Sequence, residues 1–415
     1  MPAGNNFQHS EYSRKDPGAR VNYCELGASA QPDSPAWLDA MAEHGKKLAG
    51  AGVRAVIFLH GTHLGTDLFG MGRLDQVGGL KRGYSRGIPG MEALLALMRE
   101  ETNGVPAMPG GATPPYTDDE TTQKLLDEQA GDAGNFTNAY VGLFKKALAR
   151  DAGRPIFCSR SLWSCEHHHL GRAGAAVRLL HRLRALCTEH GFGSGDRLLI
   201  QAHGQAGLVL ALLSNLMAPG KSTMRDAILT QLKVIMPHDE IALLESLGPS
   251  GSLLNGTALD IITFGTPVRY GWDVSGIGRL LHVVNHRMLR ADGKRWLAKM
   301  ELPQITMEMP IAWGGDYVQQ LAVAGSDAIT ASEQSTAVNK ALWELLEPWD
   351  GFERWLECAR RTTRCQNDGQ CLLVDYKDST GSTSARDHLF GHAAYTRTHA
   401  MLFNTGEIVR VLCPA

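Results

Sequence analysis

Residues 197–213, RLLIQAHGQAGLVLALL, constrain the fold of this chain more than any other segment. An apolar run breaks at small residues and then resumes with the apolar pattern of a helix. We predict a buried strand, a sharp turn and a helix in direct succession. Gly204 stands at the centre of this turn, between Ala202 and Ala206.

The composition is that of a globular protein. A chain of 415 residues with 43% hydrophobic and 20% charged residues can form one large α/β domain with insertions, or two domains. Its net charge of -2 gives no electrostatic reason to expect a nucleic-acid partner or an anionic membrane. No stretch reaches the roughly 18 to 20 apolar residues of a membrane span, and residues 1–20 are polar. We therefore expect neither an export signal nor a membrane anchor.

The cysteines indicate the compartment. Eight cysteines without paired CxxC spacing fit a reduced cytoplasmic protein better than a disulfide framework. Cys358, Cys365 and Cys371 are close enough in sequence that two of them could form a bridge in an exported protein. We expect a cytoplasmic location.

Further apolar runs predict a parallel sheet. Residues 53–59 (VRAVIFL) are apolar over almost their whole length, which is typical of a strand buried on both faces. Further strands are predicted at 154–161, 259–264, 319–324 and 371–376, and helices at 35–47, 91–101, 136–150, 172–190, 223–247 and 395–412. Residues 280–300 look basic and partly helical. This alternation favours an α/β fold with a mostly parallel, doubly wound sheet flanked by helices.

The domain prediction follows from these elements. Residues 1–50 are expected to form an N-terminal arm and helix, and residues 51–415 one α/β domain. Within it, 64–153 and 218–256 are predicted insertions. The first is too long for a simple loop and could act as a lid near the mouth of a site.

Polar residues of the types that take part in catalysis or ligand binding follow several predicted strands. His60-Gly61 follows 53–59, Gly265-Thr266-Pro267 follows 259–264, and Asp327 follows 319–324. Gly391-His392 precedes the last predicted helix. Because ligands of parallel sheets bind at the carboxyl edge, we expect these residues to meet there.

This order of features resembles the α/β-hydrolase superfamily, in its lipase and esterase-like branch, from Val53 onward. The resemblance implies hydrolysis of small-molecule or lipid-like carboxylic esters by a Ser-His-Asp triad, without cofactor or metal. His392 would be the general base and Asp327 the acid. The alternatives that remain open are His388 or His399 for the base and Asp375 or Asp378 for the acid.

The same resemblance implies the rest of the site. The backbone N–H groups of Thr62 and Gln205 would form an oxyanion hole. His60, Tyr270 and Trp272 would contact the substrate, although aromatic residues after a turn are as often part of a core. Three consecutive histidines, 167–169, are expected to make polar contacts rather than bind a metal, because neighbours cannot all face one ion.

Gly204 occupies the position at which this superfamily carries its nucleophile. We interpret the chain as a silenced serine enzyme, changed from Ser to Gly. A natural pseudo-hydrolase that binds or senses small molecules is the alternative from a different functional class. A third interpretation places a water beside Gly204 and lets His392 activate it as a general base.

Overall fold

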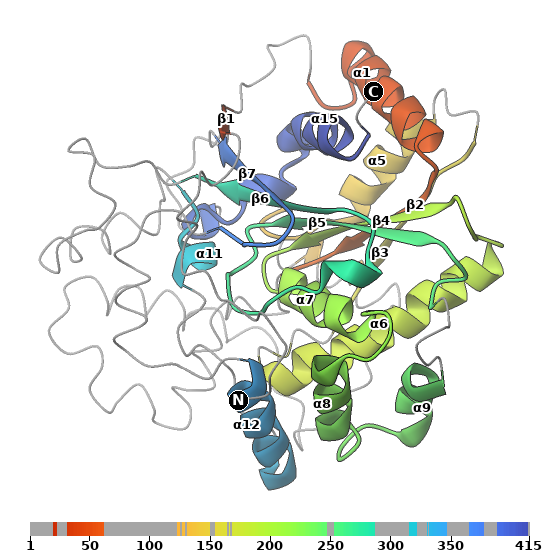
Figure 1. Cartoon of the computed structure of the whole chain (residues 1–415). Coiled ribbons are helices and arrows are strands. Elements are labelled where there is room, and N and C mark those ends of the chain that lie inside the picture. The colour runs from red at the N-terminus through yellow and green to blue at the C-terminus, as the bar shows by residue number, and fades with distance from the viewer. Residues whose placement is uncertain are drawn as a thin grey trace, which may run out of the picture.

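The structure, a computed structural model, describes residues 20–22, 31–61, 123–124, 127–128, 131–149, 154–163, 166, 168–246, 253–286, 315–321, 330, 332–346, 365–376 and 388–413. Within these residues the chain forms one seven-stranded sheet in the order β1-β7-β6-β5-β4-β2-β3 (Figure 1). All neighbouring strands are parallel. The strands are β1 (Arg20–Asn22), β2 (Val53–Leu59), β3 (Phe157–Ser161), β4 (Arg197–His203), β5 (Ala258–Phe264), β6 (Leu280–Asn285) and β7 (Gln370–Asp375).

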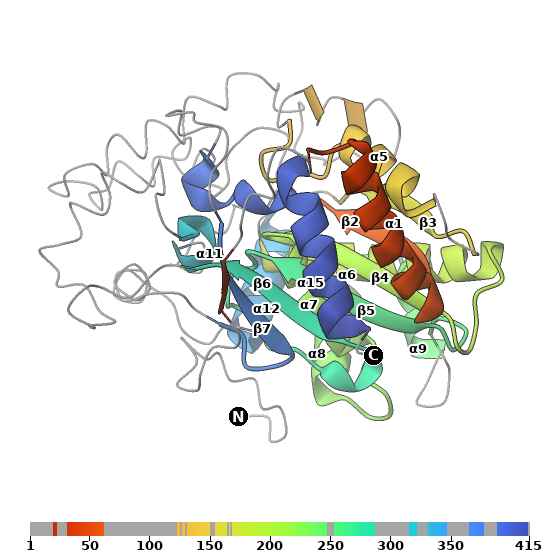
Figure 2. The same cartoon turned by 90° about the horizontal axis from the view of Figure 1, so that it is seen from above.

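Helices cover both faces of the sheet, so the predicted α/β class with a parallel sheet is confirmed. One face carries α1 (Pro35–Gly50), α5 (Asn138–Ala149) and α15 (Met401–Leu412), as Figure 2 shows from above. The other face carries α6 (His169–Glu189) and α7 (Ala206–Leu216). Farther from the sheet on that side lie α8 (Thr223–Leu232), α9 (His238–Ser246) and α12 (Glu333–Leu346).

β4 lies in the interior of the sheet, between β2 and β5. Leu198, Ile200 and Ala202 pack in the core beneath α6 and α7, whereas Leu199 packs in the core beneath α1, α5 and α15. Burial on both faces explains why the three successive residues 198–200 of β4 are all apolar instead of alternating with polar residues.

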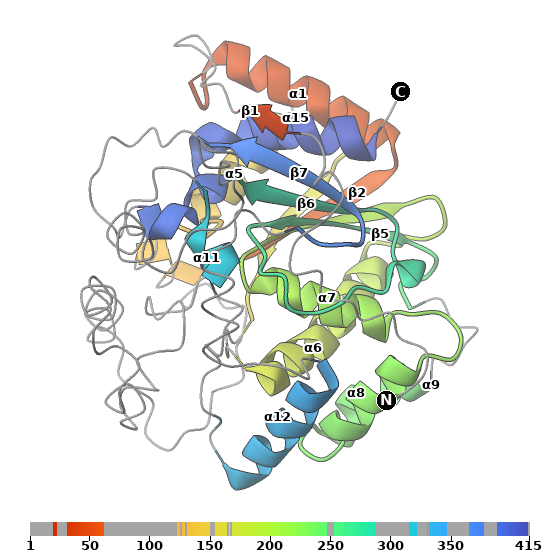
Figure 3. The ribbon, with the colours of Figure 1, turned by 60° about the vertical axis from the view of Figure 1, so that its left-hand side comes forward.

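Two predicted elements in the C-terminal half are wrong. Residues 280–285 form β6, between β5 and β7 (Figure 3), and not part of a basic helical stretch. The polar His282 is tolerated in this buried strand because its Nδ1 lies 2.6 Å from Thr263 Oγ1. Residues 319–321 belong to a short helix, α11 (Tyr317–Leu321), and not to a strand. Asp316 caps this helix, since its Oδ1 accepts the backbone N–H of Gln319 at 2.9 Å.

The other helix boundaries differ in smaller ways. The excursion predicted at 223–247 is two helices, α8 and α9, separated by a segment that contains Pro237. The last helix begins at Met401, after two short 3-10 turns. The helix predicted at 91–101 lies outside the described residues.

The predicted N-terminal helix is part of the main core. Trp37, Met41 and Leu48 of α1 are buried with residues of α5 and α15. Ser34 caps α1 by accepting the backbone N–H of Trp37 at 3.4 Å. Among the described helices, none has both the length and the apolar character needed to cross a membrane.

Candidate active site

The connection from β4 to α7 is very short, with only Gly204 and Gln205 between them. Gly204 has a φ of +54°, in the left-handed region that L side chains adopt at a cost. Its N–H donates to the carbonyl of Phe264 at 2.8 Å, and its own carbonyl accepts the hydroxyl of Thr266 at 2.9 Å. The predicted strand, sharp turn and helix are therefore present, with the turn bonded to the end of β5.

His392 and Asp316 form a buried pair beside this turn. His392 Nδ1 lies 2.7 Å from Asp316 Oδ2. Because a carboxylate only accepts hydrogen bonds, His392 Nδ1 is the donor in this pair. A Cβ built on Gly204 would stand 2.5 Å from His392 Nε2, so this second ring nitrogen faces the centre of the turn.

Asp316 is held by two further donors. The hydroxyl of Tyr395 donates to Asp316 Oδ2 at 2.8 Å, and Gln319 N–H binds Oδ1. The same tyrosine oxygen accepts the backbone N–H of Asn285, at the end of β6, at 2.7 Å. Burial raises the pKa of Tyr395, and the neighbouring Asp316 charge raises it further, so the phenol stays protonated as a donor. This network connects the carboxylate to the carboxyl edge of the sheet.

The backbone around His392 is fixed by hydrogen bonds to strand ends. His203 Nε2 donates to the carbonyl of His392 at 2.8 Å, and the two imidazole rings lie 4.0 Å apart. Asn285 Nδ2 donates to the carbonyl of Gly391 at 3.1 Å. Burial, and then the proximity of His392, lower the pKa of His203, which keeps its imidazole neutral.

Three glycines allow the backbone segments of the site to approach. A Cβ on Gly265 would lie 2.5 Å from Asp316 Oδ2 and 2.9 Å from His392 Cε1. A Cβ on Gly207 would lie 1.9 Å from Thr266 Oγ1, and one on Gly61 would lie 2.3 Å from the carbonyl oxygen of His203. A larger residue at any of these positions would push the site apart.

Asp316, which was not among the predicted acids, is the carboxylate that contacts His392 in the described part of the chain. Asp327 lies outside the described residues, as does Asp378. The alternative Asp375 is 3.1 Å from His286 Nδ1, at the ends of β7 and β6. Asp316 directly precedes α11, whereas Asp327 follows the segment 319–324 that the apolar pattern predicts as a strand and whose first three residues belong to α11.

The structure also describes His388 and His399, the two alternative candidates for the general base. His388 is buried at the start of the 3-10 turn that precedes His392, and His399 lies in a later 3-10 turn. The described residues show neither of them in a hydrogen bond with Asp316. Of the histidines considered, His392 is the one that joins Asp316 to Gly204.

The residues predicted to form the oxyanion hole and to contact the substrate differ in what the structure shows of them. Thr62 lies outside the described residues. Gln205 is 3% exposed, and its Oε1 is buried with no hydrogen-bond partner among the described residues. His60 joins β2 to the segment after β3, because its carbonyl accepts Trp163 Nε1–H at 2.9 Å. The oxyanion role of Gln205 and the substrate role of His60 stay predictions.

Tyr270 and Trp272 pack in the core on the α6 and α7 side of the sheet. The Tyr270 hydroxyl lies 2.7 Å from His169 Nδ1 and 2.9 Å from Arg172 Nη1. The ring of Trp272 meets His282 edge-on, with centroids 5.2 Å apart. Both aromatic residues are more than nine-tenths buried, and their contact with a substrate stays a prediction.

The histidine run has structural contacts where it is described. His168 caps α6, because its Nδ1 accepts the backbone N–H of Gly171 at 2.8 Å. His169 binds Tyr270, and His167 is not described. The described residues contain no group of three His, Cys, Asp or Glu side chains arranged to hold a metal ion.

The class that this structure defines is an α/β protein with one parallel sheet and a buried Asp–His pair at its carboxyl edge. No model of a known protein family matches the chain, and searches of curated proteins and of solved structures returned no match. The feature from which a function can be inferred is therefore the geometry of Asp316, His392 and Gly204. In this geometry His392 Nε2 faces a position that has no side chain.

Proposed function

We propose that the chain is a member of the α/β-hydrolase superfamily, built to bind carboxylic esters of the lipase or esterase type, with the nucleophile of its triad replaced by Gly204. The observation that carries this proposal is the line of contacts from Asp316 through His392 to Gly204. The positive φ of Gly204 supports it, because a strained turn between strand and helix is the site of the nucleophile in that superfamily.

The chemistry follows from the protonation of His392. With Nδ1–H bound to Asp316, Nε2 can accept a proton from a hydroxyl placed at position 204. Asp316 would stabilise the imidazolium that forms. Loss of the nucleophile of a serine hydrolase lowers turnover by about a million-fold, as in the subtilisin example. We therefore infer that this chain holds an ester better than it cleaves one.

The decisive experiment restores the missing hydroxyl. Gly204→Ser should hydrolyse short p-nitrophenyl esters faster than the parent chain by several orders of magnitude. The matched control is Gly204→Ala, which brings the same Cβ near His392 without a hydroxyl. A folded Gly204→Ser protein with no gain over Gly204→Ala would contradict the silenced-enzyme proposal. Ester binding without that gain would favour the alternative, a natural small-molecule binding or sensing protein.

A slow reaction through water is the second candidate, favoured because His392 Nε2 faces a position without a side chain. His392 would remove a proton from a water, which would attack the ester carbonyl directly. The parent chain should then show a low turnover that His392→Ala abolishes. Equal rates for the parent and His392→Ala proteins would exclude this route.

A cytoplasmic location of the protein is part of the same proposal. The structure describes five cysteines, Cys158, Cys187, Cys365, Cys371 and Cys413, and none of them is in a disulfide bond. The thiols of Cys365 and Cys371 are hydrogen-bonded to each other, and a cytoplasmic location predicts that this pair is reduced. Trapping the cysteines with an alkylating reagent during cell lysis measures the redox state directly.

A further inference from the structure

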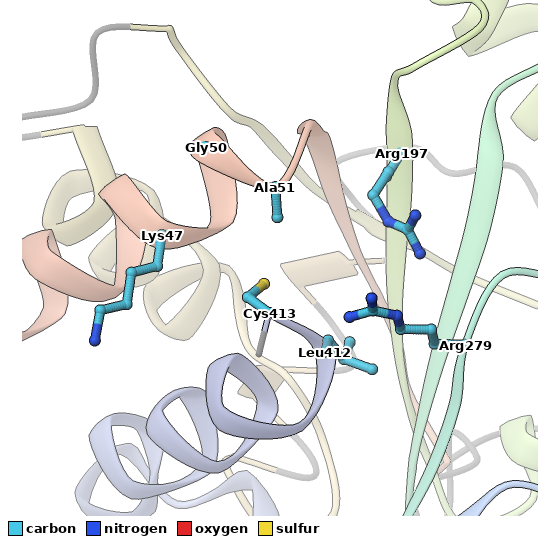
Figure 4. A pocket seen from close by; sticks show the side chains of 7 residues that line it. All are labelled: Lys47, Gly50, Ala51, Arg197, Arg279, Leu412 and Cys413. Atoms are coloured by element: carbon cyan, nitrogen blue, oxygen red, sulfur yellow. The ribbon is translucent and has the colours of Figure 1, made fainter. Parts of the chain in front are cut away.

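A separate cavity of about 360 Å³ opens at the opposite edge of the sheet from His392 (Figure 4). Arg197, the first residue of β4, and Arg279, directly before β6, line it together with Lys47, Leu412 and Cys413. β4 has seven residues, so the cavity lies about 20 Å along the strand from the turn at Gly204. It is therefore distinct from the candidate active site.

The cavity has more cationic than anionic groups. Asp260 is 1% exposed and binds the Arg197 guanidinium through both oxygens, with Nε at 2.7 Å from Oδ2. Its Oδ1 also accepts the backbone N–H of Arg279 at 2.9 Å. The guanidinium of Arg279 and the ammonium of Lys47 have no ion pair with any residue in the described part of the chain. One carboxylate, Asp260, therefore stands against the two guanidinium groups, while the Lys47 ammonium points away from them in Figure 4.

Two helix ends partly offset this charge. α1 and α15 both end at the cavity, and a helix C-terminus has a partial charge of about -0.5. Lys47, in the last turn of α1, compensates one of them. The full charge of Arg279 exceeds the remaining partial charge, so the cavity is positive overall.

The side chains are arranged for a ligand between the two arginines. In Figure 4 the guanidinium groups of Arg197 and Arg279 extend into the same space, with the Cys413 sulfur beside it. Arg197 Nε and Nη2 bind Asp260, and Nη1 takes no part in these two hydrogen bonds. Leu412 and Ala51 supply apolar surface on the other wall. Guanidinium groups bind planar and tetrahedral oxyanions with paired hydrogen bonds.

We propose that this cavity is a binding site for a small phosphate-bearing molecule, with the phosphate group between Arg279 and Arg197. The charge selects an anion, and the volume admits an organic group attached to it. The phosphate could be free inorganic phosphate or the head of a phosphomonoester. The apolar wall at Leu412 and Ala51 favours the phosphomonoester.

Titration calorimetry of the full chain tests the site with two probes, inorganic phosphate and phenyl phosphate. Arg279→Gln should weaken binding of both by about tenfold or more, because a hydrogen bond to a charged group is lost. Arg279 is exposed, so its replacement leaves the core intact. Lys340→Gln, on the exposed side of α12, is the matched control and should bind as the parent does. Binding of neither probe, or equal affinity in Arg279→Gln, would overturn the proposal.

Cys413 provides an independent readout of the local charge. An anionic methanethiosulfonate reagent should modify this thiol about tenfold faster than a cationic one of similar size. Cys371, a half-buried thiol elsewhere in the chain, is the internal comparison. Phenyl phosphate should protect Cys413 and leave Cys371 unaffected, as measured by peptide mass spectrometry. A lack of charge preference at Cys413, or no protection, would contradict a phosphate site.

Discussion

The imidazole of His392 lies in the space that a side chain on Gly204 would occupy, since a Cβ there would be 2.5 Å from Nε2. A serine at position 204 therefore requires the ring to retreat slightly. Asp316 must then remain bonded to Nδ1 while the ring shifts. His392 can therefore take its present position only because residue 204 has no side chain.

The identity of the acid can be tested in the Gly204→Ser protein. Asp316→Asn should lower its turnover by about 10³- to 10⁴-fold, because an amide no longer fixes the tautomer that a carboxylate selects. The measurement is ester hydrolysis at saturating substrate. Asp327→Asn is the matched control and should leave the rate nearly unchanged. The reverse result would assign the acid to Asp327.

Tyr395 should contribute to stability through its hydroxyl. Tyr395→Phe leaves the buried N–H of Asn285 without its acceptor and removes one donor from Asp316. We expect the free energy of unfolding in urea to fall by about 1 to 3 kcal/mol. In the Gly204→Ser background the turnover should fall as well, because Asp316 loses one of the donors that hold it against His392. Tyr376→Phe loses a hydrogen bond to Asn404 and should leave that turnover unchanged.

Gly265 should tolerate no side chain. Gly265→Ala places a methyl group against Asp316 and His392 at a φ of +61°, so steric contact and backbone strain act together. A loss of at least about 1 to 3 kcal/mol in unfolding free energy is expected from the strain alone. Gly142→Ala is the control, because that glycine is exposed in α5 with open space around it. It should be neutral or stabilise the protein by up to about 1 kcal/mol. Equal effects at the two positions would show that the packing at Gly265 is looser than described.

Acid should destabilise the fold through its buried histidines. Burial lowers the pKa of His282 from 6.5 to about 3, so the folded protein keeps this ring neutral where the unfolded chain binds a proton. The stabilising contribution is complete above about pH 6.5 and is lost progressively as the pH falls toward 3. Urea unfolding at pH 7, 6 and 5 measures this slope. His282→Gln should have a shallower slope than the parent, and equal slopes would contradict the prediction.

Several elements of the fold could be predicted from local patterns. β2, β4 and β5 are apolar runs buried on both faces, and α1 begins with Ser34 and Pro35 as its start signals. The apolar pattern alone does not predict β6, because the polar residues His282 and Asn285 interrupt it. Both polar side chains contact other segments: His282 Nδ1 lies 2.6 Å from Thr263 Oγ1, and Asn285 Nδ2 donates to the carbonyl of Gly391.

The sequence by itself determined the parallel α/β sheet, the turn at Gly204 and the position of His392 after Gly391, because each of these depends on neighbours along the chain. Only the tertiary structure decided that Asp316 binds His392, that Tyr395 supports Asp316 and that Gly265 leaves room for both. The physical reason is that a hydrogen bond between residues far apart in sequence depends on where the strands between them are placed. Local sequence patterns predict the elements, and the packing of the sheet selects which side chains meet at its edge.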